Sequence, residues 1–264
     1  MSLKPVLRWA GSKRKLLPNL RSALPPTFER YIEPFAGSAV LFFDLLPEKA
    51  VLGDLNPEII ATYEAIRDDP HEVFELLNSI PLNSEAYYLL RSLNTNCLKA
   101  SERAARLIYL MKACFNGVYR TNKSGQFNVP IGSRIYSLPD LNQLRQLSSA
   151  LSGVTLTCGD FEQSIKNTTE NDFVYIDPPY SDGTRFRGEY GYAGSFVKTD
   201  QERLVEVCRG LTDRGTKVLL SFRECDVLCD ALKGWTLRKI TVARSVAGFS
   251  HSRCKANEIL ASNY

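Results

Sequence analysis

The residues best placed to do chemistry form one short run, Asp177-Pro178-Pro179-Tyr180. The run directly follows an apolar stretch, Phe173–Ile176, that is predicted to be a buried strand. Ligand sites in open α/β sheets lie at the carboxyl ends of strands, so a side chain at this position can act on a substrate. The two prolines fix φ and remove two backbone donors, which makes the turn stiff.

This stiff turn would hold a carboxylate, a free carbonyl and an aromatic ring in fixed relation. Such a set suits methylation of the exocyclic amine of adenine, whose lone pair is delocalised into the ring. Asp177 and the Pro178 carbonyl can accept the two N–H groups and free the lone pair, while the Tyr180 ring stacks on the base. A base in a duplex must first be flipped out to reach them. The alternative is a rigid turn with a purely structural role.

A second candidate site is the segment Glu33-Pro34-Phe35-Ala36-Gly37-Ser38, a glycine turn between a predicted strand and a predicted helix. Such a turn lets the backbone approach a cofactor closely. Asp54 follows the next predicted strand, where an acid can accept hydrogen bonds from ribose hydroxyls. The sequence has no G-x-G-x-x-G, which argues against a nicotinamide dinucleotide enzyme, and no G-K-[ST] phosphate loop.

The N-terminal run Arg8-Trp9-Ala10-Gly11-Ser12-Lys13 is short, basic and aromatic. This run is a third candidate for the functional site. By composition alone, a loop that leads to a capped helix explains it as well as a functional role does. Basic residues without intervening acids also occur over 1–25 and 112–134, and another basic cluster lies near the C-terminus. Three separated basic segments could converge on one surface that binds a polyanion, although each alone resembles ordinary solvated surface.

The elements that would position these residues alternate as in an α/β protein. Residues 30–35 and 49–53 are predicted strands, separated by a helix Ala39–Leu46 that Ser38 can cap. Asn56-Pro57 then begins another helix. This βαβ pattern implies a parallel sheet. Further strands are expected at 154–157, 173–176, 217–222, 235–242 and 257–263.

A helical block interrupts this sheet pattern. Residues 58–114 carry apolar pairs at helical spacing, and another helix is predicted at 138–151. The segment between them is rich in Gly, Asn, Ser and Pro and suits an ordered loop or hairpin near 115–132. We therefore assign residues 1–59 and 146–264 to one domain and residues 60–145 to a helical insert.

The composition of the 264 residues fits a globular chain, with 44% hydrophobic residues and a net charge of +4. No apolar run is long enough to span a membrane and the first residues lack a signal-peptide pattern, so a cytoplasmic protein without a membrane partner is expected. The seven cysteines form no C-x-x-C pair and are expected to be free thiols. With only His71 and His251, a multi-histidine zinc site is excluded, and no metal is expected.

Taken together, the motifs match a known family. The chain resembles the Dam-type (α-group, D12 class) DNA adenine-N6 methyltransferases, which share W-A-G-x-K near the N-terminus, E-P-F-x-G, an acid after the second strand, a helical insert and D-P-P-Y. The segments 115–122 and 125–132 look like that family's DNA-reading hairpin. Ser12 and Ala39 replace two glycines that are frequent in the family, and neither change removes a side chain needed for chemistry.

The resemblance implies a Rossmann-like, S-adenosylmethionine-dependent methyltransferase sheet with a helical target-recognition insert. The catalytic residues would be Asp177, Pro178, Pro179 and Tyr180. Contacts to the cofactor S-adenosylmethionine would come from Trp9, Lys13, Glu33, Phe35, Gly37, Asp54, Asp160, Phe161 and Asp177. In the hairpin, Arg120 would read a guanine. Further DNA contacts would come from Lys123 and from two asparagines that suit ordinary turns equally well, Asn116 and Asn122.

The expected activity is methyl transfer to N6 of a flipped adenine in a short duplex sequence, with GATC as the first candidate. The partner would be double-stranded DNA bound by a monomer, within a restriction-modification system or outside one. The alternatives are cytosine-N4 DNA methylation, RNA methylation and DNA binding without activity; cytosine-N4 enzymes usually resemble S-P-P-Y rather than D-P-P-Y. The loop Ser181–Ser195, rich in glycine and aromatic residues, is expected to close over the flipped base.

Overall fold

The computed structural model describes residues 2–9, 11–134, 137–179, 196–224, 226–243 and 255–264. The strands in these ranges are β1 (Arg30–Glu33), β2 (Ala50–Asp54), β3 (Val154–Cys158), β4 (Asp172–Ile176), β5 (Lys217–Arg223), β6 (Thr236–Ala243) and β7 (Lys255–Ser262). They form one sheet in the order β3-β2-β1-β4-β5-β7-β6. Neighbours from β3 to β5 are parallel, and β7 is antiparallel to β5 and β6. The predicted α/β fold with a mainly parallel sheet is confirmed.

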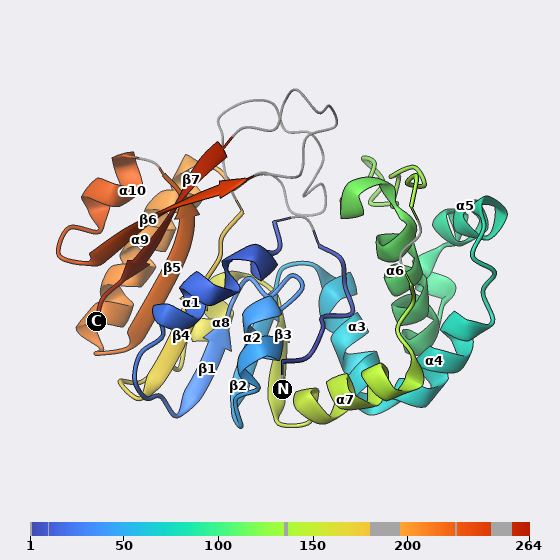
Figure 1. The fold of residues 1–264 in the computed structure, drawn as a ribbon, viewed down its shortest axis with the longest axis horizontal. Coiled ribbons are helices and arrows are strands. Elements are labelled where there is room, and N and C mark those ends of the chain that lie inside the picture. Colours follow the sequence, from blue (N-terminus) through green and yellow to red (C-terminus); the bar gives the residue numbers. More distant parts are fainter. Residues whose placement is uncertain (1, 10, 135–136, 180–195, 225, 244–254) are drawn as a thin grey trace.

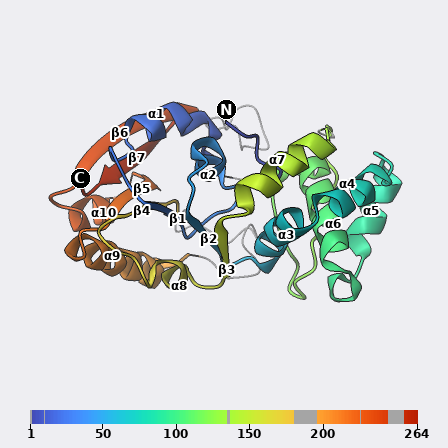
Figure 2. The ribbon, with the colours of Figure 1, turned by 90° about the horizontal axis from the view of Figure 1, so that it is seen from below.

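Helices cover both faces of this sheet (Figures 1 and 2). One face carries α1 (Leu17–Ser22) and α2 (Val40–Leu45), and the other carries α8 (Phe161–Ile165), α9 (Lys198–Asp213) and α10 (Asp226–Ala231). Side chains of β4 alternate between two cores, with Phe173 and Tyr175 in the first core and Val174 and Ile176 in the second. Because both faces are covered, this strand is apolar without a break.

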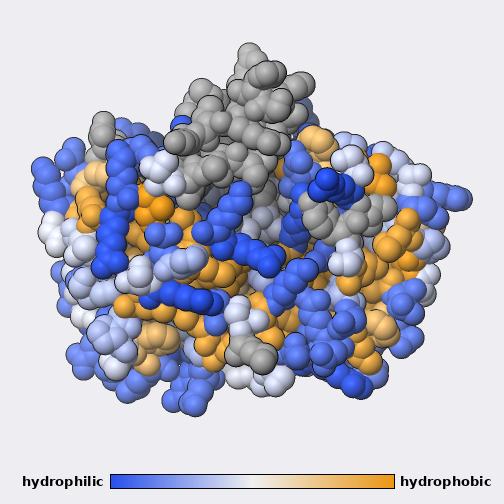
Figure 3. All heavy atoms as spheres, in the orientation of Figure 1, coloured by the Kyte–Doolittle hydropathy of each residue, from blue (hydrophilic) through white to orange (hydrophobic). Residues whose placement is uncertain are grey.

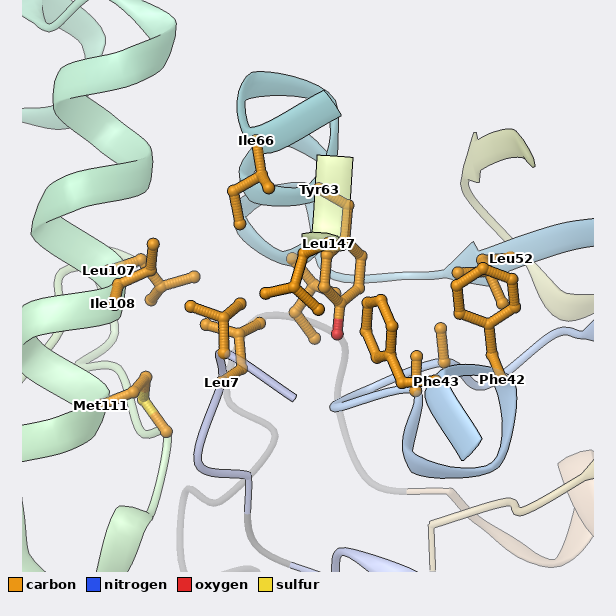
Figure 4. Packing of buried hydrophobic residues seen from close by; sticks show 14 of the residues in the cluster. Leu7, Phe42, Phe43, Leu52, Tyr63, Ile66, Leu107, Ile108, Met111 and Leu147 are labelled. Atoms are coloured by element: carbon orange, nitrogen blue, oxygen red, sulfur yellow. The ribbon is translucent and has the colours of Figure 1, made fainter. Parts of the chain in front are cut away.

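The helical block consists of α3 (Pro57–Asp68), α4 (Pro70–Asn78), α5 (Ser84–Ser92), η2 (Thr95–Cys97), α6 (Ala100–Ala113), η3 (Phe115–Gly117) and α7 (Leu141–Leu151). It lies beside the β3 edge of the sheet (Figure 2). The first core continues into it, from Phe43 through Tyr63 and Leu7 to Ile108 and Met111 of α6 (Figure 4). The first core is therefore shared by the sheet and the helical block, whereas the second core lies on the other face of the sheet.

The surface is mixed in character on the face shown in Figure 3, where apolar residues reach the surface over the helical block among hydrophilic ones. Around α5, the exposed apolar side chains include Leu82, Leu89 and Leu93. None of the helices in the described ranges combines the length and the apolar character needed to cross a bilayer.

The prediction that Ser38 caps α2 is wrong. The helix begins at Val40, Ala39 occupies the N-cap position with φ of 47°, and no side chain caps it. Ser38 is instead buried. Alanine rarely adopts a left-handed conformation, so the sequence carries no sign of this turn. The predicted start of a helix at Asn56-Pro57 is confirmed, since α3 begins at Pro57. The structure adds that Asn56 caps this helix, because its side chain accepts a 3.0 Å hydrogen bond from the Glu58 amide.

Candidate active site

A cavity opens at the carboxyl ends of β1, β2 and β4, where the sequence motifs are expected to meet. All of the predicted cofactor contacts line it, together with Pro178 and Pro179. Motifs that lie far apart in the sequence therefore form one site. Tyr180 and the loop 181–195 lie outside the described residues, so their predicted roles are not addressed by the structure.

The turn after β1 presents its backbone to Trp9. Gly37 has φ of 48°, a left-handed conformation that favours glycine. A Cβ atom at this position would lie 3.1 Å from Cδ1 of Trp9, so the indole packs against the bare backbone. The Gly37 carbonyl accepts a 2.7 Å hydrogen bond from the Tyr63 hydroxyl of α3. Trp9 and Tyr63 thus hold the position of the glycine turn.

Asp54, at the end of β2, has both carboxylate oxygens bound by backbone amides. Its Oδ2 accepts a 2.9 Å hydrogen bond from the Gly37 amide, and its Oδ1 accepts a 2.8 Å hydrogen bond from the Asn56 amide. Burial raises the pKa of Asp54 to about 6, and these two bonds limit the rise. A carboxylate offers about four acceptor positions, so Asp54 can still accept hydroxyl groups of a ligand.

Glu33, at the end of β1, is almost completely buried. Its Oε2 accepts a 2.8 Å hydrogen bond from the Tyr31 hydroxyl. Burial raises the pKa of Glu33 well above its usual value, and the nearby Asp177 and Asp54 add to the rise. Glu33, Asp54 and Asp177 thus lie together on a cavity wall that also includes the carboxyl groups of Asp160 and Asp200. The negative potential of the ionised groups favours a ligand that carries positive charge.

Asp177 follows β4 and receives two hydrogen bonds on one oxygen. Its Oδ1 accepts a 2.6 Å hydrogen bond from Lys13 Nζ and a 3.1 Å hydrogen bond from Ser221 Oγ of β5. The Lys13 and Asp177 side chains are only 7% and 18% exposed, so water screens this ion pair weakly. Burial raises the pKa of Asp177, while Lys13 and Ser221 lower it in part.

Ser221 and Tyr175 belong to this site although the sequence analysis did not predict them. The Tyr175 hydroxyl lies 3.0 Å from Ser221 Oγ, and Tyr175 also lines the cavity. One sequence signal existed, since Ser221 interrupts the apolar run 218–222 and a buried serine needs a hydrogen-bond partner. Only the fold reveals that this partner is Asp177, 44 positions away.

Aromatic rings form another part of the cavity wall. Phe35 stacks on Phe161 with ring centroids 5.2 Å apart and planes inclined by 26°, and Phe196 contacts Phe35 edge-on at 6.1 Å. Asp160 caps α8 and forms a 2.8 Å ion pair with Arg203. The Asp160 carboxylate therefore lies on the cavity wall and is also held in place by the start of α8 and by Arg203.

Residues 9–246 match the family described as D12 class N6 adenine-specific DNA methyltransferase. The chain belongs to this family. The match begins at Trp9 and extends past β6, so it includes the cavity and the whole helical block. The chain is thus an adenine-specific DNA methyltransferase, as the sequence analysis expects.

Relatives of similar length agree with this assignment. A Type II methyltransferase of Lactococcus lactis subsp. cremoris is 37% identical and covers 100% of this chain and 96% of its own. A Type II methyltransferase of Methanocaldococcus jannaschii is 32% identical over 93% of both chains. A DNA adenine methylase of Haemophilus influenzae is 26% identical over 98% of this chain and 93% of its own. Among solved structures, a precorrin-6y C5,15-methyltransferase of Geobacter metallireducens is 12% identical over 98% of both chains, with a TM-score of 0.41.

In the methyltransferase, the segment 115–132 forms an irregular antiparallel hairpin, with a bridge between Thr121 and Phe127 near its tip. Arg120 is half-buried on this hairpin. Its Nε donates a 2.7 Å hydrogen bond to Asn128 Oδ1, and its guanidinium also contacts the Asn128 carbonyl at 3.2 Å. A residue of the opposite arm therefore orients the arginine that is predicted to read DNA.

The asparagines of the hairpin have conformational roles. Asn122 Oδ1 accepts 3.0 Å hydrogen bonds from the amides of Ser124 and Gln126, which closes the tip. Asn116 has φ of 54°, a left-handed conformation in which asparagine is enriched. Both residues thus have a role in forming turns, which the sequence analysis gave as the alternative to a role in DNA contact. Lys123 is exposed at the tip.

The N-terminal motif of the methyltransferase connects the cavity to the hairpin. Trp9 stacks on Tyr119 with ring centroids 5.2 Å apart and planes inclined by 27°. The Arg8 guanidinium donates a 3.3 Å hydrogen bond to the Cys114 carbonyl at the base of the hairpin. Within the basic N-terminal segment, Arg8 thus contacts the hairpin, whereas Lys13 is buried against the cavity.

Proposed function

We propose that this methyltransferase takes its methyl group from S-adenosylmethionine and transfers it to N6 of an adenine flipped out of double-stranded DNA. The position of Asp177 supports this proposal best. Asp177 lies at the end of β4, on a cavity that Gly37, Asp54 and Phe161 also line. A carboxylate that can accept an amine N–H is therefore adjacent to a pocket that suits the cofactor.

The residues around the cavity fit S-adenosylmethionine, which supplies an electrophilic methyl group on a positively charged sulfur. The carboxyl groups on the cavity wall, among them Glu33, Asp54 and Asp177, suit a cationic ligand. Asp54 retains acceptor capacity for ribose hydroxyls. The stacked Phe35–Phe161 pair offers an apolar surface for a purine. The turn at Gly37 lets a ligand approach the backbone closely.

For the target amine, we assign Asp177 and the Pro178 carbonyl as acceptors of the two N–H groups. Two acceptors favour a pyramidal nitrogen, whose lone pair is then free to attack the methyl group. Lys13 and Ser221 both donate to Oδ1 of Asp177, so Oδ2 is the oxygen that we assign to the amine. Tyr180, which lies outside the described residues, would stack on the flipped base.

We assign target recognition to the helical insert, residues 60–145, and within it to the hairpin. Arg120, held by Asn128, is suited to the O6 and N7 atoms of a guanine. Lys123, at the exposed tip, is suited to a phosphate contact. The proposed target is a short palindrome such as GATC, methylated by a monomer.

The proposal is tested with methyl-labelled S-adenosylmethionine and duplexes that each carry one candidate target. We expect label in N6-methyladenine after digestion to nucleosides, and none for Asp177→Asn at the same protein concentration. Calorimetry should detect cofactor binding without added metal. Label in N4-methylcytosine would contradict the assigned base, and a lack of binding to the intact protein would contradict the assigned cofactor.

A further inference from the structure

Tyr175 and Ser221 connect the interior of the sheet to Asp177. Tyr175 is on β4 and Ser221 on the neighbouring β5, and both side chains are at most 1% exposed. Ser221 Oγ lies 3.0 Å from the Tyr175 hydroxyl and 3.1 Å from Asp177 Oδ1. The three groups therefore form a continuous chain of hydrogen bonds that ends at the cavity.

The available protons determine which group donates at each step of this chain. An ionised Asp177 carries no proton on its carboxylate and can only accept. Ser221 has one hydroxyl proton, which it donates to Asp177. Tyr175 must then donate to Ser221, and burial keeps it protonated by raising the pKa of Tyr175 well above its usual value. The chain thus runs in one direction, from Tyr175 to Asp177.

We infer that Ser221 is a positioning residue for methyl transfer, and that Tyr175 orients its hydroxyl group. The inference rests on the proposed role of Asp177. The Cβ–Cγ torsion of an aspartate is intrinsically broad, so a lone carboxylate has no fixed orientation. Lys13 and Ser221 approach Oδ1 from different elements and restrict this torsion, which gives Oδ2 a constant direction toward the amine.

Packing alone does not explain a serine at this position. Its neighbours on β5, Leu220 and Phe222, are buried and apolar, and an apolar residue would fill the same place without a hydroxyl group. A buried hydroxyl lowers stability unless it is hydrogen-bonded. Both partners of Ser221, Tyr175 and Asp177, line the cavity, so the hydroxyl serves the site. The bond from Tyr175 also polarises the Ser221 hydroxyl and strengthens its bond to Asp177.

The test is the pH dependence of the single-turnover methylation rate for Ser221→Ala, at saturating cofactor and DNA. We expect the rate at neutral pH to fall about tenfold, as for one hydrogen bond to a charged group. The acid limb of the profile contains the ionisation of Asp177 beside those of Glu33 and Asp54. Its Asp177 component should move to higher pH because a bond that lowers the pKa of Asp177 is lost.

The matched control is Thr216→Val. Thr216 is fully buried just before β5, and its hydroxyl donates a 2.9 Å hydrogen bond to the Thr169 carbonyl. This variant also loses a buried hydroxyl bond, but at the opposite end of the strand from Asp177. We expect a similar loss of thermal stability in both variants and a wild-type pH profile for Thr216→Val only.

Tyr175→Phe gives a second variant in which the Ser221 hydroxyl remains. We expect a smaller shift of the acid limb in the same direction, and no further shift when it is added to Ser221→Ala. Wild-type acid limbs in both single variants, or an equal shift in Thr216→Val, would overturn the inference. If Asp177→Asn retains turnover, the proposed role of Asp177 fails; if it is inactive while Ser221→Ala behaves as wild type, only the positioning role fails.

Discussion

Lys13 and Asp177 are 164 positions apart in the sequence, yet their side chains form a 2.6 Å ion pair on the wall of the cavity. Lys13 begins the short turn η1 (Lys13–Leu16), and Asp177 follows the central strand β4. A buried carboxylate without a cation tends to take up a proton. The pair therefore lowers the pKa of Asp177 and favours the charged form, which can accept an amine N–H.

Lys13→Met should lower the free energy of unfolding more at pH 8 than at pH 5. Without Lys13, the folded-state pKa of Asp177 rises further, so this group stabilises the fold below its unfolded pKa and loses that contribution as pH rises through the folded value. At pH 8 the buried charge is unpaired, and we expect a loss of about 3 kcal/mol. Urea unfolding at both pH values measures this, with Lys13→Arg as the control that keeps the charge. Equal losses at both pH values would contradict the argument.

Asp54 should make the ligand-free protein less stable as the pH rises from about 4 to 7. Its pKa is about 6 in the folded protein against an ordinary value of 3.8, so the folded state binds this proton more tightly. The stabilisation of the folded state by Asp54 is complete below the pKa of the unfolded protein and is lost as pH rises through the pKa of the folded protein. The free energy of unfolding should fall by about 3 kcal/mol over this range.

The measurement for Asp54 is urea unfolding of the wild type and of Asp54→Asn across this pH range. Carboxylates with a lowered pKa, such as Asp44, change stability in the opposite sense in both proteins. The difference between the two proteins isolates Asp54, because asparagine does not titrate. A difference that stays constant with pH would show that the Asp54 pKa is not raised.

The stack of Trp9 on Tyr119 predicts that the hairpin supports cofactor binding. Tyr119→Leu removes the ring that holds Trp9, and an aromatic pair contributes about 1 kcal/mol, so S-adenosylmethionine should bind about fivefold more weakly. Tyr88→Leu is the matched control, since Tyr88 is exposed on α5. Calorimetric titration of both variants gives the two affinities. Equal affinities would mean that Trp9 keeps its position without Tyr119.

The parts of the fold that the sequence predicts depend on local patterns. The apolar run 173–176 predicts β4, and the alternation of strand and helix over 30–54 predicts a parallel sheet. Since parallel strands end at one edge, the same reasoning places Asp54 and Asp177 beside one cavity, as the structure shows. The left-handed Ala39 could not be foreseen, because its conformation is set by the packing around the turn and not by its own preference.

The parts of the site that the sequence did not predict are contacts between residues distant in the chain. Ser221 and Tyr119 lie in segments that the sequence analysis singled out, but their partners, Asp177 and Trp9, are 44 and 110 positions away, and only the fold brings them together. For Asn122 the sequence leaves two roles open, because asparagine is common both in turns and in DNA contacts. The hydrogen bonds that its Oδ1 accepts from the amides of Ser124 and Gln126 show that it has the turn role.

Arg120→Ala should relax discrimination at one guanine of the target by roughly 1–3 kcal/mol, because the proposed bidentate contact to that base would be lost. Asn128→Ala should act in the same direction with a smaller effect, since Asn128 Oδ1 holds Arg120 Nε at 2.7 Å. Lys123→Ala should weaken cognate and near-cognate DNA equally and reduce the salt dependence of binding. Values of kcat/KM on duplexes that differ by one base pair separate these effects. If Arg120→Ala lowers both rates by the same factor, Arg120 is a backbone contact and does not read a base.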